Sequence, residues 1–271
     1  MFQITDREYK VLTEYILKHY GIKLGTEKKT LVVGRLKNVL VQKNFSSFSE
    51  YYDYIVADKT GVAATTLVDK ITTNHTYFMR EPAHFHYFRD HVLPSLANTV
   101  TDKDLRIWSA GCSTGEEAYT LAMIMQDHFA QDRPLWDKKV LATDISSKVL
   151  EIAKKGEYRD ENIAAIPSNW KSEYFKKLGN DQSIVSDTIR NETIFRSFNL
   201  MNARFPFKKK FHVIFCRNVM IYFDMQTKNA LVDKFYDHLE SGGYLFIGHS
   251  ESLNREKTRF KFVMPAVYRR E

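Results

Sequence analysis

Hydrophobic residues recur every three or four positions through the first part of the chain, the spacing of a helix with one buried face. This pattern predicts four helices, over residues 6–18, 26–42, 49–55 and 65–71. Thr5 or Asp6 can cap the first helix, and Tyr20-Gly21 ends it. We expect these helices to form a small helical domain over residues 1–75, within the ordinary range of domain sizes.

A different pattern follows in the second part of the chain. Short apolar runs predict strands over 105–108, 140–144, 211–218, 244–248 and 260–269, with helices over 118–128, 146–155 and 225–239 between them. Strands separated by helices favour an α/β domain with a doubly wound parallel sheet, which we expect over residues 99–271. Residues 76–98 connect the two domains, and a helix there is expected to end at Pro94. Ser241-Gly242-Gly243 predicts a turn before the strand at 244–248.

Residues 158–198 interrupt this alternation. They contain a helix-like piece at 172–177 and two pieces, at 183–188 and 193–198, whose residues favour strands. We expect this segment to form an inserted helix and a small antiparallel β subdomain.

A small-residue turn with two glycines, Gly111 and Gly115, follows the first predicted strand. Glycine lets the backbone approach a ligand closely, and the N–H groups that open a helix face such a ligand. The spacing differs from the dinucleotide fingerprint GxGxxG, and Glu116 and Glu117 follow where a pyrophosphate would be repelled. The turn favours a ligand with a positive group and hydroxyls, such as S-adenosylmethionine (SAM), although packing alone can also explain it.

Several chemistry-bearing residues stand at the ends of predicted strands: Gly111, Asp144, Arg217 and Asn218. Ligands of doubly wound sheets bind at the carboxyl ends of the strands, where the strand order reverses. The sequence therefore predicts one ligand site formed by these residues.

The composition sets broad limits on the kind of protein. The chain has 271 residues and a net charge of +7, which favours a negatively charged partner without choosing among nucleic acid, anionic lipid and an acidic protein. No run approaches the ~20 apolar residues of a membrane span, and the first residues lack the apolar core of a signal peptide. Cys112 and Cys216 are the only cysteines, so a disulfide framework and a cysteine zinc site are excluded. We therefore expect a cytoplasmic protein without membrane insertion.

Most of the excess positive charge lies in one short segment. Between Lys23 and Lys43 there are six basic residues and one acid, Glu27, which give the segment a net charge of +5. On a continuous helix Lys28 and Arg35 would share nearly the same bearing, beside the apolar stripe. This helix edge is either a docking surface for an acidic partner or a solvated face.

Motifs spread along the chain point to one family. They are Thr72-Thr73-Asn74-x-Thr76, Phe78-x-Arg80-Glu81, Trp108-Ser109-Ala110-x-x-Ser113-Thr114-Gly115-Glu116-Glu117, Thr143-Asp144-Ile145, Asn199-Leu200 and Phe215-Cys216-Arg217-Asn218-Val219-Met220-Ile221-Tyr222-Phe223. With these motifs the chain resembles the CheR family, the chemotaxis receptor glutamate methyltransferases, over essentially its full length. The resemblance implies a Rossmann-like SAM-dependent methyltransferase domain behind a helical docking domain.

The resemblance also implies a cofactor site and a reaction. SAM, which leaves as S-adenosylhomocysteine (SAH), would be held by Asn74, Thr76, Arg80, Glu117, Asp144, Asn199, Leu200, Arg217 and Asn218, with no metal. Glu117 is preferred to Glu116 for this role. Arg80 and Tyr222 would lie beside the methyl group as it passes to a glutamate carboxylate, which is already ionised at neutral pH and needs no strong base.

The partner that the resemblance implies is the Glu-rich cytoplasmic helical region of methyl-accepting chemotaxis receptors. Lys28 and Arg35 would then form the docking face. The segment 176–182 is shorter than in family members that bind a receptor tail peptide, so we expect no tail tethering.

Other interpretations remain for parts of this picture. Asp144 could serve only to cap the helix at Ser146, Asn199 could be a turn residue, and Tyr222 could be a core aromatic. A nucleic-acid methyltransferase would share the fold and the charge, but the Pro-containing motifs used on bases are missing. A non-catalytic SAM-binding protein is the remaining alternative.

Overall fold

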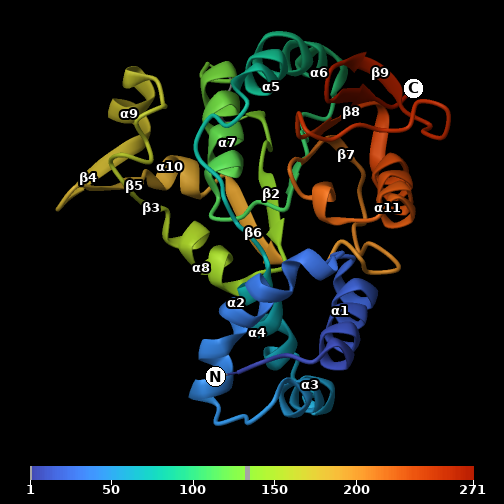
Figure 1. Ribbon diagram of the computed structural model, residues 1–271. Coiled ribbons are helices and arrows are strands. Elements are labelled where there is room, and N and C mark those ends of the chain that lie inside the picture. Colours follow the sequence, from blue (N-terminus) through green and yellow to red (C-terminus); the bar gives the residue numbers. More distant parts are fainter. Residues whose placement is uncertain (1, 132–134) are drawn as a thin grey trace.

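The computed structural model describes residues 2–131 and 135–271. Figure 1 shows a helical domain packed below an α/β domain, with the amino terminus in the first and the carboxyl terminus at the far edge of the second.

The helical domain consists of α1 (Asp6–Tyr20), the 3-10 turn η1 (Thr26–Lys28), α2 (Lys29–Gln42), α3 (Phe48–Ala57) and α4 (Val62–Ile71). The prediction of a helical domain is confirmed. Thr5 caps α1: its Oγ1 accepts from Glu8 N at 3.2 Å while Thr5 N donates to Glu8 Oε2 at 2.9 Å. The second predicted helix is divided, because Thr26–Lys28 form a 3-10 turn before α2 begins.

Residues 72–81 contain neither helix nor strand and form the connecting segment between the domains, which is followed by α5 (Pro82–Tyr87), the π-helical turn η2 (Phe88–Val92) and α6 (Leu93–Thr99). The prediction that the helix ends at Pro94 is wrong, since Pro94 lies in the first turn of α6. Proline lacks an N–H, and its ring presses on the carbonyl four residues earlier. The wider π-helical turn immediately before α6 accommodates this ring.

The α/β domain contains a seven-stranded mixed sheet in the order β6-β2-β1-β7-β8-β10-β9. Its strands are β1 (Ile107–Ala110), β2 (Val140–Asp144), β6 (Thr193–Ser197), β7 (Phe211–Cys216), β8 (Leu239–Ile247), β9 (Lys261–Met264) and β10 (Val267–Arg269). The first five strands in spatial order are parallel, and β10 runs antiparallel to both of its neighbours, β8 and β9. The strand order reverses between β1 and β7.

Helices cover both faces of this sheet, as predicted for a doubly wound domain. The helices that follow the strands are α7 (Glu116–His128), α8 (Ser147–Lys155) and α11 (Met225–His238). Side chains of α7, α8 and η2 share one hydrophobic cluster, and those of α11 lie in another on the opposite face. Figure 1 shows α7 and α11 on the two sides of the strands.

The inserted subdomain is smaller than predicted. It consists of α9 (Ser168–Tyr174), α10 (Asp187–Arg190) and a three-stranded antiparallel sheet with β3 (Glu157–Arg159), β4 (Phe175–Gly179) and β5 (Gln182–Val185) in the order β3-β5-β4. The assignment of 193–198 to it is wrong, because β6 pairs in parallel with β2 at the edge of the main sheet. The helix-like piece at 172–177 is also wrong in its second half, where β4 begins.

Two further predictions near the carboxyl terminus need correction. Residues 241–243 lie inside β8 rather than in a turn, and Gly242, with φ +81°, allows the irregularity there. Residues 260–269 form a hairpin of β9 and β10 instead of one strand. The chain reverses direction at Ala266, which has φ +63°. The alternation of apolar residues continues across this turn and so did not reveal it.

Candidate functional site

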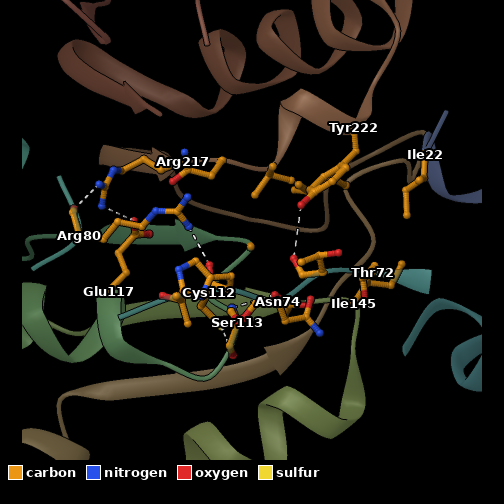
Figure 2. A pocket seen from close by; sticks show the side chains of 18 of the residues that line it. Ile22, Thr72, Asn74, Arg80, Cys112, Ser113, Glu117, Ile145, Arg217 and Tyr222 are labelled. Carbon is orange, nitrogen blue, oxygen red and sulfur yellow. Dashed lines mark hydrogen bonds and ion pairs between the residues drawn. The ribbon is translucent and has the colours of Figure 1, made fainter. Parts of the chain in front are cut away.

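A cleft of about 1010 Å³, counted with its open mouth, lies at the carboxyl ends of β1, β2 and β7. Residues 72–77 and Arg80 of the connecting segment, together with the end of α1, form its other walls. The cleft therefore occupies the position where doubly wound sheets bind ligands. Figure 2 shows Arg80, Glu117 and Arg217 gathered at one end of the cleft and Tyr222 and Ile22 at the other.

Every residue that the sequence predicted for cofactor binding or catalysis lines this cleft. They are Asn74, Thr76, Arg80, Glu117, Asp144, Asn199, Leu200, Arg217, Asn218 and Tyr222. The predicted docking residues Lys28 and Arg35 lie outside it.

The glycine turn is shaped by a close approach between two loops. Gly111 has φ +91°, and a Cβ there would stand 2.4 Å from Val219 Cγ2, on the loop after β7. Glycine is therefore required on both conformational and steric grounds. The turn brings the ends of β1 and β7 together at the floor of the cleft.

Asp144 has two backbone donors at the end of β2. Its Oδ2 accepts from Ser113 N at 2.8 Å, and its Oδ1 accepts from Ser146 N at 2.9 Å. Burial raises the pKa of Asp144, with a smaller contribution from the charge of Asp69, although the backbone hydrogen bonds oppose the shift. The Ser146 side chain itself caps α8, so Asp144 joins the β1 turn to the start of α8 while its carboxylate faces the cleft.

The two acidic residues of the turn point in different directions. Glu117 lines the cleft, where Ser109 Oγ donates to its Oε1 at 2.7 Å and Arg217 Nη1 to its Oε2 at 2.9 Å. Glu116 is only 4% exposed and accepts from Thr114 Oγ1 at 2.7 Å. Burial raises the pKa of Glu116. The geometry thus places Glu117, rather than Glu116, at the cleft.

Arg217 is the most enclosed charged side chain of the site, 2% exposed. Besides Glu117, its guanidinium donates to Glu81 Oε2 at 3.0 Å and to the carbonyl of Arg80. Asn218 Nδ2 donates to the other oxygen of Glu81 at 3.2 Å. The Arg80 side chain turns back to donate to the carbonyl of His75 at 2.7 Å. One connected network therefore joins the loop after β7 to the connecting segment.

Tyr222 lies at the junction of the two domains, in the 3-10 turn η4 (Met220–Tyr222). Its hydroxyl is 3.4 Å from the carbonyl of Thr73, and its own carbonyl accepts from Lys23 N at 2.8 Å. The ring packs partly against the core of the helical domain while still lining the cleft. It is a half-buried cleft residue and not a core aromatic.

The Asn199 side chain spans the domain boundary. Its Nδ2 donates to the carbonyl of His19, at the end of α1, at 2.8 Å, and its Oδ1 accepts from Met201 N at 2.9 Å. Asn199 therefore fixes the wall of the cleft through both side-chain groups.

Sequence reasoning missed the wall of the cleft formed by the end of α1, and it missed several lining residues on other elements. The missed lining residues include Tyr20, Ile22, His75, Tyr77, Ile145, Phe198 and Val219. The Tyr20-Gly21 pair was interpreted only as the end of a helix. A Cβ at Gly21 would stand 2.5 Å from Met201 Sδ, a close approach between domains that no local pattern reveals.

Arg35 does not face solvent beside Lys28. Its Nη2 donates to Thr73 Oγ1 at 2.9 Å, and its Nη1 donates to the carbonyls of Thr72, at 3.3 Å, and Ile71. Since Lys28 lies in the turn before α2, the two side chains do not share one continuous helix edge. Arg35 anchors the start of the connecting segment.

Within residues 2–131 and 135–271, one cluster has the donor types of a metal site: Glu81, His84 and His249, with donor atoms within 4.8 Å of one another. The Glu81 carboxylate, however, already accepts from Arg217 and Asn218. The positive charge of Arg217 therefore already balances the carboxylate of Glu81. We interpret the three residues as part of the hydrogen-bond network that shapes the site. In the same residues no helix is both long and apolar enough to cross a membrane.

Comparisons with known proteins agree with this geometry. Residues 74–268 match the family model described as CheR methyltransferase, SAM binding domain, and residues 7–72 match CheR methyltransferase, all-alpha domain. A chemotaxis protein methyltransferase of Borreliella burgdorferi is 40% identical over 270 residues, which cover 98% of this chain and 95% of that protein. The Escherichia coli chemotaxis protein methyltransferase is 31% identical over 268 residues, covering 98% of this chain and 91% of that protein.

Both domains thus have counterparts in these proteins along nearly the whole sequence. The chain belongs to the CheR methyltransferase family and carries its SAM-binding domain.

Proposed function

We propose that this protein transfers the methyl group of SAM to glutamate side chains of methyl-accepting chemotaxis receptors, forming glutamyl methyl esters. The observation that carries this proposal is the arrangement of the cleft. Carboxylates and a guanidinium lie at the strand ends, and Arg80 and Tyr222 line the same cleft beside the domain junction. The relatives, which are chemotaxis protein methyltransferases by name, support the same assignment.

The residues present fit the charges of SAM. Asp144 presents a carboxylate at the end of β2, the position from which dinucleotide folds bind ribose hydroxyls. Glu117 provides a second carboxylate for the amino group of the methionine part. Arg217 balances Glu117, and the free donors of Arg80 suit a carboxylate. When bound, SAM supplies an activated methyl group on a positively charged sulfur.

The transfer itself needs alignment more than acid–base chemistry. A receptor glutamate, with a pKa of ~4.3 in water, enters as a carboxylate. One of its oxygens forms a bond to the methyl carbon as the carbon–sulfur bond breaks, and the bonding electrons leave on the sulfur of SAH. Arg80 and Tyr222 orient the incoming carboxylate, and the helical domain covers one side of the cleft and so limits the access of water.

We place receptor docking on the helical domain, on the basic segment between Lys23 and Lys43. An acidic helical rod would be attracted to it over a distance comparable with the Debye length. Lys28, which is half-buried, is the docking residue we retain, and Arg35 contributes through the segment that it anchors. The partner is a protein, not nucleic acid, and the site of action is the cytoplasm.

The inserted subdomain gives no support for tail tethering. Asn180 and Asp181, with φ +50° and +54°, close the β4–β5 hairpin in a tight two-residue turn. On this short loop we base the proposal that no receptor tail peptide is bound here.

The test uses SAM with a labelled methyl group. Purified protein is incubated with receptor-containing membranes, with total RNA, and with neither, and Arg80→Ala serves as the control. We expect label on receptor that base releases as methanol. Label on RNA would support the nucleic-acid alternative, and SAH binding without any label would support a non-catalytic role.

A further inference from the structure

Glu81 occupies an unusual position beside the cleft. It stands at the N-cap position of α5, immediately before Pro82, with φ +57° and ψ +64°, and its side chain makes no capping hydrogen bond. This left-handed conformation costs a residue with a Cβ on the order of 1 kcal/mol, and Met79, two residues earlier, also has positive φ, at +60°. Such strain persists only where surrounding contacts stabilise it.

The contacts of the Glu81 carboxylate account for this stabilisation. Its Oε2 accepts from Arg217 Nη2 at 3.0 Å and from His249 N at 3.2 Å, and its Oε1 accepts from Asn218 Nδ2 at 3.2 Å. The buried ring of His84 lies beneath, with Nδ1 3.4 Å from Oε2. The carboxylate therefore accepts hydrogen bonds from two residues of the loop after β7 and from the backbone just after β8.

Glu81 does not line the cleft, whereas two of its partners, Arg217 and Asn218, do. Arg217 carries its charge with 2% of the side chain exposed, so it needs negative partners, and Glu81 and Glu117 flank it. Burial raises the pKa of Glu81, but the charge of Arg217 and the hydrogen bonds outweigh it, and the net pKa is lowered. The carboxylate is thus ionised at neutral pH.

We propose that Glu81 is a positioning residue for SAM: it holds Arg217 and Asn218 in the geometry that receives the cofactor, without touching the cofactor itself. The inference rests on SAM as the ligand of this cleft and is independent of which acceptor is methylated. It explains why a strained, charged residue follows Arg80 in the connecting segment. The Glu81 side chain holds the connecting segment against the residues that follow β7 and β8.

The test measures SAH binding by calorimetry, well below the unfolding midpoint of each variant. Glu81→Gln keeps the shape of the side chain and removes its charge, and we expect the Kd for SAH to rise at least tenfold. Glu81→Asp keeps the negative charge on a side chain that is one methylene shorter, so SAH should bind to it more tightly than to Glu81→Gln. Asp104→Asn is the matched control, because it breaks a carboxylate–arginine pair with Arg106, 2.6 Å apart, that lies outside the cleft.

Methyl transfer to receptor membranes gives a second readout. We expect the KM for SAM to rise with the Kd in Glu81→Gln, while kcat at saturating SAM stays within threefold of the unchanged protein. A purely structural role would lower the apparent kcat through loss of folded protein and leave the KM for SAM unchanged, and Asp104→Asn would show the same pattern.

A double-mutant cycle tests whether Glu81 acts through Arg217. If it does, Glu81→Gln combined with Arg217→Lys should weaken SAH binding no more than Arg217→Lys alone. Additive losses, or an unchanged Kd in folded Glu81→Gln, would overturn the proposal. If Glu81→Gln does not fold, Glu81→Asp carries the same comparison. Failure to label receptor with the unchanged protein would count against the proposed acceptor and leave this binding test intact.

Discussion

Arg35 Nη2 donates to Thr73 Oγ1 at 2.9 Å, and this bond connects α2 of the helical domain to the segment that forms one wall of the cofactor cleft. The carbonyl of Thr73 is also the partner of the Tyr222 hydroxyl, at 3.4 Å. The helix carrying the basic segment is therefore joined, through one arginine, to a predicted catalytic residue.

Substitutions at Lys28 and Arg35 should have different effects. Lys28→Glu should slow receptor methylation several-fold, most strongly at low ionic strength, and leave SAH affinity unchanged. Arg35→Ala removes donors from Ile71, Thr72 and Thr73, so it should lower the unfolding free energy by about 1–3 kcal/mol and also weaken SAH binding. Methylation rates at several salt concentrations, with calorimetry, check both. An SAH affinity that is unaffected by Arg35→Ala would contradict the anchoring role.

Arg80→Ala and Tyr222→Phe test the proposed transfer step. We expect Arg80→Ala to reduce methylation by about 10²-fold, because orientation of the acceptor is lost. Tyr222→Phe keeps the packing of the ring against the helical domain and removes only the hydroxyl, so a loss of about tenfold is expected in a fully folded protein. Initial rates and circular dichroism measure the two effects. Normal activity in either folded variant removes that residue from the mechanism.

Asp144→Asn should separate stability from binding. Burial raises the pKa of Asp144, which means that the buried charge costs folding free energy at neutral pH. The amide removes this cost, but its single carbonyl oxygen can accept only one of the two hydrogen bonds from Ser113 N and Ser146 N, and its NH2 group faces the other donor. These two effects oppose each other, so we expect the unfolding free energy at pH 7 to stay within about 2 kcal/mol of the unchanged protein, together with at least tenfold weaker SAH binding. Urea unfolding and calorimetry decide, and equal affinity would exclude Asp144 from the cofactor site.

Gly111→Ala should destabilise the protein by about 1–3 kcal/mol, since the new Cβ meets Val219 Cγ2 and the backbone has φ +91°. Adding Val219→Ala removes the steric part and leaves the conformational part, so partial recovery is expected. Val149→Ala, in α8, is a control for the loss of a valine side chain from a buried position. Urea unfolding of the single and double variants gives the result, and an unchanged free energy in Gly111→Ala would refute the close approach.

His84 should make stability depend on pH. Burial lowers its pKa to about 3, helped by the positive charge of Arg217, from an ordinary value of 6.5. Between pH 6.5 and pH 3, His84 binds a proton in the unfolded chain but not in the folded protein. The contribution of neutral His84 to the unfolding free energy is therefore fully present above about pH 6.5 and is lost as the pH falls toward 3. The loss of unfolding free energy between pH 7 and pH 5 should be smaller in His84→Gln than in the unchanged protein. The exposed His86→Gln is the control and should behave like the unchanged protein.

Much of the secondary structure could be predicted because its causes are local. Thr5 caps α1 and Ser146 caps α8 through bonds to residues three positions later, and β2 and α8 have the bounds that the apolar pattern indicated. The prediction failed for β6, whose alternation suits either sheet. Only its pairing with β2 decided which sheet it joins.

The sequence by itself determined the helical domain and the doubly wound core, because periodicity and caps are properties of neighbouring positions. Its motifs, through the family they resemble, also gave the predicted cofactor residues of the cleft. Only the tertiary structure decided that Arg35 turns inward, that the end of α1 forms a wall of the cleft and that Glu81 holds Arg217. The reason is physical: these contacts join residues far apart in the chain, 38 positions for Arg35 and Thr73, 180 for Asn199 and His19, and 136 for Arg217 and Glu81. Such contacts depend on how whole elements pack, which no single segment specifies.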